Sequence, residues 1–499
     1  MLRLLALLIA CCLAMPAAAQ HLRIGIVSDP DGLDPTLSRT VAGRQVFAAM
    51  CDKLVDINER LEIVPQLATA WRWADDGRAL VFTLREGVRF HDGEPLTGEA
   101  AAIGLRRHLE TPGSTRRAEM GPVTEVVATG PLEVTLRLSE PFAPLLAALS
   151  DRAGMLVSPR QARITGADFQ REPACAGPFR LTRRVPQDRM ELERFEGYWD
   201  HASIHYERVT YRPITDATVR LANLRAGALE VIERVTPSDV GDVRRDQRVR
   251  LHQGPSLATF YIAINVGNGP RSQTPLGQDA RVREALERSI DRQALVNVAF
   301  EGLWVPANQA VPTDHPFYAR SVPIPPRDVA RARALLREAG HQRVRIRLSV
   351  PNTTDYTQSS EVNQAMAAEA GIDIEIQQVE TATLLNQWSA GDFEALMIQW
   401  SGRVDLDGNI FAFTTCNVPL NGGKYCNPAV DALLTEARRS VDPAVRAAAY
   451  DRAARIYLAD RPYINLWQPL TLHGALAGVQ GLRVVPDGLI RVQGLRGTR

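Results

Sequence analysis

Two pairs of carboxylates lie close enough together in the sequence to suggest acid–base chemistry. Asp75 and Asp76 are adjacent, and Asp405 and Asp407 are one residue apart. A glycosidase uses such a pair as an acid and a base or nucleophile. Each pair lies in a polar, turn-like segment, where carboxylates are commonly solvated. The chain has no Gly-x-Ser-x-Gly elbow, no His-Glu-x-x-His motif and no P-loop. We therefore expect a protein that is not an enzyme, with an exported hydrolase as the alternative.

The first nineteen residues predict where the protein works. Arg3, the apolar run Leu4–Ala10 and the small residues Ala17–Ala19 are typical of a secretory signal peptide cleaved before Gln20. The apolar run is too short to span a bilayer. Cys11 follows a lipoprotein-like box, so a form tethered by acylated Cys11 is the alternative. We expect an exported, periplasmic protein.

Cysteines and histidines favour disulfides over a metal site. Past the predicted signal, the chain has Cys51, Cys175, Cys416 and Cys426, with no Cys-x-x-Cys pair, and its nine histidines lack ligand spacing. In an oxidising compartment, a bridge between Cys416 and Cys426 would clamp the polar loop between them. Cys51 and Cys175 either form a second bridge or pack as thiols. No metal and no cofactor are expected.

Composition excludes other classes of partner. The net charge is +1, and removal of Arg3 leaves 57 basic against 57 acidic residues. Such a chain lacks the broad positive field that binds nucleic acid or anionic membranes. The roughly 480 mature residues exceed one hydrophobic core and predict at least two lobes.

The apolar patterns predict an α/β chain in two parts. Leu22–Val27 is an alternating strand that ends at a Gly/Pro/Asp loop. Phe260–Asn265 is a buried strand and a crossing point into the second part. Val344–Val350 and Ile372–Ile376 are strict period-2 strands on either side of a helical stretch, which indicates a βαβ unit with parallel strands. Asp279 and Asp291 are predicted helix N-caps, and residues 328–339 are predicted to form a helix closed by Gly340. Further helices are expected at 217–227, 431–439 and 443–458.

A block near the amino terminus carries a family resemblance. Ala70–Thr97 predicts strand, turn, strand, turn and helix, with Thr97 as the helix cap. The block is similar to the signature of the bacterial solute-binding proteins that serve ABC importers of peptides, opines and nickel. Segments resembling other parts of that family follow in the same order: Gly177–Leu181, Glu193–Trp199, Asp279–Arg292 and Trp400–Asn409.

The resemblance implies a two-lobed periplasmic binding protein of the cluster C type. Residues 20–260 and 472–499 would form a first lobe with an extra subdomain at about 50–160, and residues 261–471 the second lobe. The lobes would close around a small peptide or peptide-like solute and deliver it to the permease subunits of an ABC importer. A nickel, haem or opine receptor is the alternative within the family. We expect a monomer.

The same resemblance points to ligand contacts. Asp405 corresponds to the aspartate that takes the peptide ammonium in relatives, although Leu406 replaces the proline that often follows it. Arg403 would pair with a ligand carboxylate or hold Asp405. Trp400 is an apolar wall or a core residue. The loop Asp31, Gly32 and Leu33 follows a strand end, where α/β folds place ligands.

Overall fold

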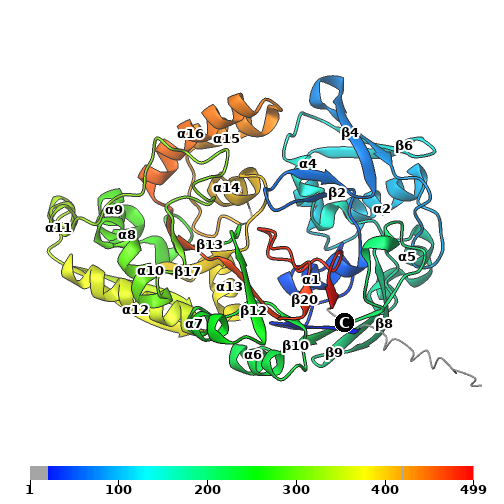
Figure 1. Ribbon diagram of the computed structural model, residues 1–499. Coiled ribbons are helices and arrows are strands. Elements are labelled where there is room, and N and C mark those ends of the chain that lie inside the picture. The colour runs from blue at the N-terminus through cyan, green and yellow to red at the C-terminus, as the bar shows by residue number, and fades with distance from the viewer. Residues whose placement is uncertain (1–20, 419, 498–499) are drawn as a thin grey trace, which may run out of the picture.

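The computed structural model describes residues 21–418 and 420–497. The predicted signal peptide, residues 1–19, and its Cys11 lie outside them. Figure 1 shows two halves side by side, with both ends of the described chain in the same half. Across the described residues, no helix combines the length and the apolarity that a membrane crossing requires.

The first lobe is built on a mixed seven-stranded sheet. Its strands, in spatial order, are β12 (Val249–Gly254), β19 (Thr471–Leu476), β11 (Val231–Ile232), β1 (His21–Ile26), β10 (Arg208–Pro213), β9 (Arg189–Arg194) and β8 (Phe179–Val185). Strand β1 pairs in parallel with β10 and β11, while β12 and β19 are antiparallel. Helices belonging to this lobe are α1 (Val41–Met50), α5 (Pro159–Thr165), α6 (Ala217–Arg225) and α7 (Pro237–Arg245).

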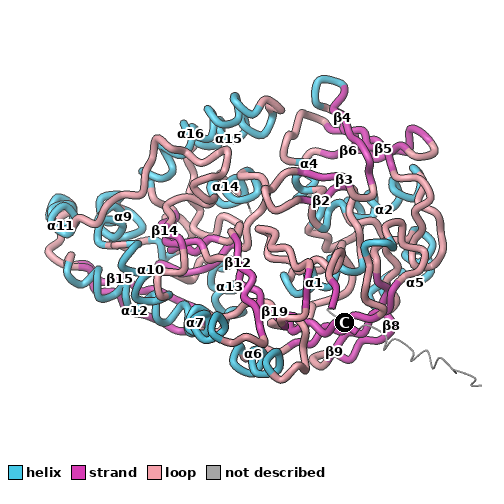
Figure 2. Tube along the Cα trace, in the orientation of Figure 1, coloured by secondary structure: helices cyan, strands magenta, loops and turns pink. Residues whose placement is uncertain are grey.

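An extra subdomain is inserted into the first lobe. Its antiparallel sheet has the order β4 (Ala68–Ala74), β5 (Ala79–Leu84), β7 (Glu133–Leu138) and β6 (Val123–Gly130). The hairpin β2 (Val55–Ile57) and β3 (Ile63–Pro65) and the helices α2 (Gly98–Glu110), α3 (Arg116–Met120) and α4 (Leu145–Ala148) complete it. The predicted succession over 70–97 is confirmed, and Thr97 Oγ1 accepts from Ala100 N at 3.1 Å. In Figure 2, strands β4, β5 and β6 of the subdomain lie at one end of the lobe, and the pair β8–β9 lies at the other.

The second lobe has a six-stranded sheet with helices around it. The strand order is β14 (Val305–Pro306), β18 (Tyr463–Gln468), β13 (Thr259–Ile264), β17 (Ala395–Trp400), β15 (Val344–Pro351) and β16 (Ile372–Val379). Strands β15 and β16 are parallel and are joined through α12 (Thr354–Glu369), so the predicted βαβ unit is confirmed. The other helices are α8 (Pro275–Gln278), α9 (Ala280–Ser289), α10 (Arg292–Phe300), α11 (Val329–Glu338), α13 (Thr381–Ala390), α14 (Asp407–Thr414), α15 (Pro428–Arg439) and α16 (Pro443–Asp460).

The helix caps follow the sequence, with two differences. The predicted caps Asp279 and Asp291 each accept a hydrogen bond from a backbone N–H in the first turn of α9 and α10. Asp328, predicted as the first residue of a helix, is the N-cap of α11 and accepts from Arg331 N. Helix α15 begins at Pro428, three residues before the predicted start. Asn427 caps it by accepting from Ala429 N, and the fixed φ of proline suits the first helical position.

The chain crosses between the lobes twice. It leaves β12 at Gly254 and enters β13 at Thr259, and it returns between Gln468 of β18 and Thr471 of β19. The crossings are adjacent because β12 pairs with β19 and β13 pairs with β18. Two short, neighbouring connections are the arrangement that allows hinge motion of one lobe against the other.

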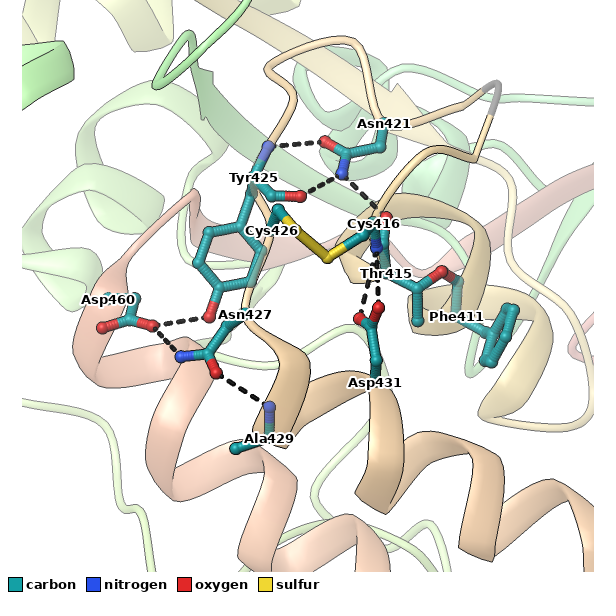
Figure 3. Close-up of a disulfide and its surroundings, with 10 residues drawn as sticks. All are labelled: Phe411, Thr415, Cys416, Asn421, Tyr425, Cys426, Asn427, Ala429, Asp431 and Asp460. Atoms are coloured by element: carbon teal, nitrogen blue, oxygen red, sulfur yellow. Dashed lines mark hydrogen bonds between the residues drawn. A yellow bond between two sulfur atoms is a disulfide. The ribbon is translucent and has the colours of Figure 1, made fainter.

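The described residues include two disulfides. Cys51, at the end of α1, is bonded to Cys175, 124 residues later, with 4.9 Å between the Cα atoms. The sequence left open whether these two cysteines pair. The second bridge joins Cys416 and Cys426, and Asn421 braces the loop between them by donating to Thr415 O at 3.0 Å (Figure 3).

Candidate functional site

The segment from Trp400 to Asn409 leaves the end of β17 and enters α14. Asn409 Oδ1 accepts hydrogen bonds from Trp400 Nε1 at 2.9 Å and from Arg403 N at 2.6 Å, and Asn409 Nδ2 donates to Arg403 O at 2.9 Å. Gly402 permits the turn because its φ is +78° and a Cβ there would lie 2.1 Å from Leu257 O. Asn409, which the sequence analysis did not single out, therefore fixes both Trp400 and Arg403.

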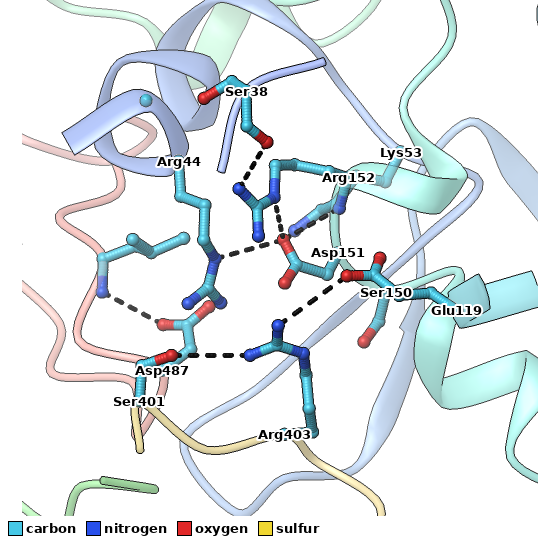
Figure 4. A network of polar contacts seen from close by, with 12 residues as sticks. Ser38, Arg44, Lys53, Glu119, Ser150, Asp151, Arg152, Ser401, Arg403 and Asp487 are labelled. Carbon is cyan, nitrogen blue, oxygen red and sulfur yellow. Dashed lines mark hydrogen bonds and ion pairs between the residues drawn. The ribbon is translucent and has the colours of Figure 1, made fainter. Parts of the chain in front are cut away.

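Arg403 reaches from the second lobe to the subdomain of the first. Its guanidinium carbon lies 4.5 Å from the centre of the Trp400 ring, within cation–π range. Its Nη2 lies 3.7 Å from Glu119 Oε1 in α3 (Figure 4). Arg403 does not hold Asp405, which was one of its two expected roles. It connects the lobes instead.

Asp405 is bound inside the second lobe by Arg446 of α16. Arg446 donates from Nη1 to Oδ2 at 2.8 Å and from Nη2 to Oδ1 at 2.6 Å, and it also donates to the Tyr450 hydroxyl at 2.9 Å. The two paired side chains are only 11% and 8% exposed. Such a bidentate pair is among the strong ionic contacts in proteins. A ligand ammonium would have to compete with Arg446, and the role of Asp405 toward a ligand stays a prediction.

The other predicted carboxylates are also accounted for. Asp407 is paired with Arg438 of α15, which donates at 2.8 and 3.1 Å. Asp75 and Asp76 are exposed and lie in a 3₁₀ turn between β4 and β5. Over residues 21–418 and 420–497, no group of three or more His, Cys, Asp or Glu side chains could hold a metal ion.

Asp31 organises its own loop. Its carboxylate accepts from Ser38 Oγ at 2.6 Å, Arg39 N at 2.7 Å and Thr40 Oγ1 at 2.8 Å. Thr40 in turn caps α1 by accepting from Gly43 N at 3.1 Å. Gly32 and Leu33, in the same loop, are buried. The predicted loop thus supports the start of α1, and these three residues are not brought together with Trp400 and Arg403.

Helix α1 and the turn after α4 contribute the next charged groups. Arg44 Nε donates to Asp151 Oδ1 at 3.1 Å, and Arg152 Nε lies 3.8 Å from the same oxygen (Figure 4). Arg152 Nη1 also donates to Ser38 O at 2.9 Å, so the loop held by Asp31 positions this arginine. One carboxylate therefore serves two guanidinium groups.

Glu119 is shared in the same way. Its Oε1 lies 3.3 Å from Arg116 Nη2 and 3.7 Å from Arg403 Nη2. Arg116 is 2% exposed, whereas its neighbour Arg117 on the same helix is exposed. We refer to the six residues in these contacts as the arginine cluster: Arg44, Arg116, Glu119, Asp151, Arg152 and Arg403.

The cluster has an electropositive balance. Burial lowers the pKa of Arg152 to about 9, and the neighbouring Arg116 and Arg44 contribute to that fall. Burial alone would raise the pKa of Asp151, but the surrounding arginines hold it well below its ordinary range. Burial also lowers the pKa of Arg403. The charged forms of Arg152 and Arg403 are therefore disfavoured by their surroundings, and an anion bound beside them would stabilise them.

Five of the six residues of the cluster, all except Arg403, were not predicted from the sequence. Arg44, Arg116 and Arg152 come from segments far from Arg403, and nearly every basic residue of the chain is an arginine. No local pattern marks these three. Only the fold brings them together.

The lobes also meet at the edge of this region. Arg439 of α15 forms an ion pair with Glu140. Ala143 N donates to Arg438 O at 2.9 Å, and the Arg438 guanidinium lies 4.9 Å from the centre of the Phe142 ring. These contacts join the second lobe to the subdomain of the first.

A small cavity adjoins Trp400 within the second lobe. Its volume is about 30 Å³, and its lining includes Thr259, Tyr261, Trp400, Asn409, Phe413, Tyr463 and Asn465. That is room for about one water molecule or a methyl group. A whole solute does not fit there, so the contact between the lobes is the better candidate for the binding site.

The chain is similar to known proteins over most of its length. The family model described as the middle region of bacterial extracellular solute-binding proteins, family 5, matches residues 62–418. The glutathione-binding protein GsiB of Salmonella paratyphi A is 27% identical and covers 95% of this chain and 94% of its own. Protein XP55 of Streptomyces lividans is 31% identical, over 90% of this chain and 83% of its own.

A solved structure has the same fold. The periplasmic binding protein DppA of Helicobacter pylori, in complex with the peptide STSA, superposes with a TM-score of 0.84 at 22% identity, over 96% of this chain and 99% of that one. The fold and the contact between its lobes define a two-lobed periplasmic binding protein. The chain belongs to family 5 of the bacterial extracellular solute-binding proteins, the solute-capturing components of ABC importers.

Proposed function

We propose that this protein captures a small peptide or peptide-like solute between its lobes and delivers it to the permease subunits of an ABC importer. The ion pair between Arg403 and Glu119 carries the proposal, because it brings charged groups of both lobes to one place. A solute bound there contacts both lobes and favours their closed arrangement. The relatives named for glutathione and for a bound peptide support this class of solute.

We assign roles to the predicted site residues within this proposal. Arg403 pairs with a carboxylate of the solute, and Trp400 lies against an apolar part of it. Asp405, whose two oxygens are bound by Arg446, supports the segment that carries Trp400 and Arg403, and acts on the solute through that segment. Asp31, Gly32 and Leu33 act through the loop that positions Arg152 and α1. We also propose that the two lobes are divided as expected from the sequence, with the chain crossing between them near residues 260 and 472.

The decisive experiment identifies what the protein carries. Purified protein is denatured, and the released small molecules are analysed by mass spectrometry. We expect a peptide-like compound that, added back, raises the free energy of unfolding by about 2.7 kcal/mol at a hundredfold excess over Kd. No released compound, and no saturable response to di- and tripeptides, would contradict the proposal.

The same sample separates a receptor from a hydrolase. The added compound is incubated with the protein and analysed again after an hour. We expect it to be recovered intact, because the residues at the lobe contact bind charge and supply no activated nucleophile. Stoichiometric recovery of cleavage products would favour the exported hydrolase.

Export and assembly complete the proposal. Cleavage before Gln20 releases a monomer into the periplasm, with no nucleic-acid partner. The intact mass of the mature protein tests this: a chain beginning at Gln20 supports it, and a lipid-modified chain beginning at Cys11 supports the tethered form.

A further inference from the structure

We propose that the solute is an acid with at least two anionic groups, and that the arginine cluster binds them. This inference rests on the proposed function, since it concerns a solute held between the lobes. It adds the charge of the solute and names residues of the first lobe that contact it. A neutral or basic peptide would be a poor fit to the same place.

The charge balance of the cluster is the first observation. Four guanidinium groups face two carboxylates, Glu119 and Asp151, and each carboxylate oxygen in contact is shared by two arginines. A surplus of two positive charges remains. Both lobes contribute to this surplus, because Arg403 comes from the second lobe and the others come from the first.

Neighbouring acidic residues do not cancel the surplus. Asp405 and Asp407 are each taken by an arginine of their own, Arg446 and Arg438. A second group of ion pairs beside Arg44 has no net charge. In it, Arg491 pairs with both Asp56 and Asp487, and Lys53 pairs with Asp56. These adjoining ion pairs are neutral, so the excess charge is confined to the arginine cluster.

Arg116 provides the second observation. Its side chain is 2% exposed, and its Nη2 contacts Thr115 and Glu119. Within the described part of the chain, its Nε and Nη1 have no hydrogen-bond partner, and Arg152 Nε has none that meets hydrogen-bond geometry. A buried guanidinium with unused N–H groups is costly unless an acceptor meets it. Carboxylates are the acceptors that guanidinium groups bind best.

The cluster also offers one acceptor. Asp151 Oδ2 is buried and, among the residues described, has no donor. It can accept from an amide or ammonium group that lies between the two anionic groups of a solute. The set of groups therefore suits a peptide-like acid better than an inorganic anion.

The test compares two adjacent arginines with opposite exposure. Arg116→Met removes the buried cation, and Arg117→Met removes the exposed one on the same helix as a matched control. Binding of Glu-Glu, Ala-Ala, Lys-Lys and inorganic phosphate is measured by calorimetry. We expect wild type to bind Glu-Glu at least tenfold more tightly than the other three probes. We expect Arg116→Met to weaken Glu-Glu binding about 10- to 100-fold and Arg117→Met to leave it unchanged.

Stability without solute separates binding from a structural role. Arg116→Met leaves no buried cation to satisfy, so we expect its melting temperature in the absence of solute to equal or exceed that of wild type. The shift induced by Glu-Glu should disappear. If Arg116→Met does not fold, Arg403→Gln, which alters a partly exposed side chain, serves the same comparison.

Three outcomes overturn the inference. Equal binding of Ala-Ala and Glu-Glu would show that the cluster does not select acids. Undiminished Glu-Glu binding by Arg116→Met would remove that residue from the site, and binding of phosphate alone would indicate a site for a simple anion. The first two leave the peptide receptor standing, whereas failure of every peptide probe and of the released compound would overturn the proposed function itself.

Discussion

Two ionic regions near the join of the lobes differ in how their charge is balanced. Around Asp405, one carboxylate meets one guanidinium in a bidentate pair, and Tyr450 uses another donor of the same arginine. In the arginine cluster, each carboxylate is divided between two arginines, and buried N–H groups remain without an acceptor among the described residues. The first region is complete within the protein. The second is completed by an anion.

The difference teaches how to separate structural charge from binding charge. Residue type does not do so, because both regions consist of arginines and carboxylates. Their stoichiometry does, since a one-to-one buried pair needs no further partner and a surplus of cations does. The following predictions test that distinction.

The largest effect should come from breaking the Asp405 pair. Asp405→Ala leaves Arg446 buried without its counter-ion, which typically costs about 3–5 kcal/mol. We expect the free energy of unfolding, measured by urea denaturation, to fall by that order. We expect the affinity of the folded variant for its solute to change little by comparison.

Asp314→Ala is the matched control for this substitution. Asp314 is an exposed carboxylate close to the same region, so its removal should alter the free energy of unfolding by less than about 0.5 kcal/mol. If Asp405→Ala instead keeps full stability and loses solute binding, Asp405 is a ligand residue, as its sequence context suggests, and the comparison fails.

An intermediate effect should appear on acidification. His108 of α2 is buried, with Nδ1 bonded to Thr36 Oγ1 and Nε2 to Met155 O, both at 2.9 Å. Burial lowers the pKa of His108 to about 4, and Arg116 and Arg107 act in the same direction. Between pH 6.5 and pH 4 the unfolded chain therefore binds a proton that the folded one does not. We expect about 2 kcal/mol of stability to be lost from this residue between pH 7 and pH 5.

His315 provides the comparison on the Asp405 side. Burial lowers its pKa as well, but Asp405 and Asp314 oppose the shift. Denaturation profiles at pH 5 and pH 7 should show that His108→Gln reduces the acid sensitivity more than His315→Gln. Equal reductions in acid sensitivity for the two variants would mean that the electrostatic potential at His108 does not differ from that at His315.

The smallest effect should follow from the exposed ion pair at the edge of the lobe contact. Arg439 and Glu140 are 53% and 42% exposed, and such pairs contribute about 1 kcal/mol or less. We expect Glu140→Gln to weaken solute binding no more than fivefold, with the difference vanishing at high salt. A tenfold or larger loss of affinity would mean that the Arg439–Glu140 pair, and not the arginine cluster, contributes most to holding the lobes together around the solute.

Local features of the fold could be predicted because their causes are local. Period-2 runs and an intervening helical stretch specified the parallel pair β15 and β16, and single residues such as Thr97 and Asp279 specified helix starts. The chain length predicted at least two lobes, and the family resemblance supplied their arrangement and the subdomain, which no local pattern contains.

The site could be predicted only in part. Trp400 and Arg403 lie together as a consecutive segment would suggest, but the carboxylate of Asp405 is taken by a residue 41 positions away. Arg116 and Arg117 are chemically identical in the sequence, and one is buried while the other is exposed. Burial of that kind depends on packing between distant segments, which a single sequence does not reveal.

The bond between Cys51 and Cys175 has a consequence for the evolution of the molecule. Its Cα atoms are 4.9 Å apart, little more than the 3.8 Å between consecutive residues, so the chain leaves and re-enters the lobe at nearly one point. The strands of the seven-stranded sheet all lie outside the segment between the two cysteines, so we expect recombination to be able to exchange that segment as a cassette. Because Arg116, Glu119, Asp151 and Arg152 all lie in that cassette, its exchange would alter the preferred cargo in one step.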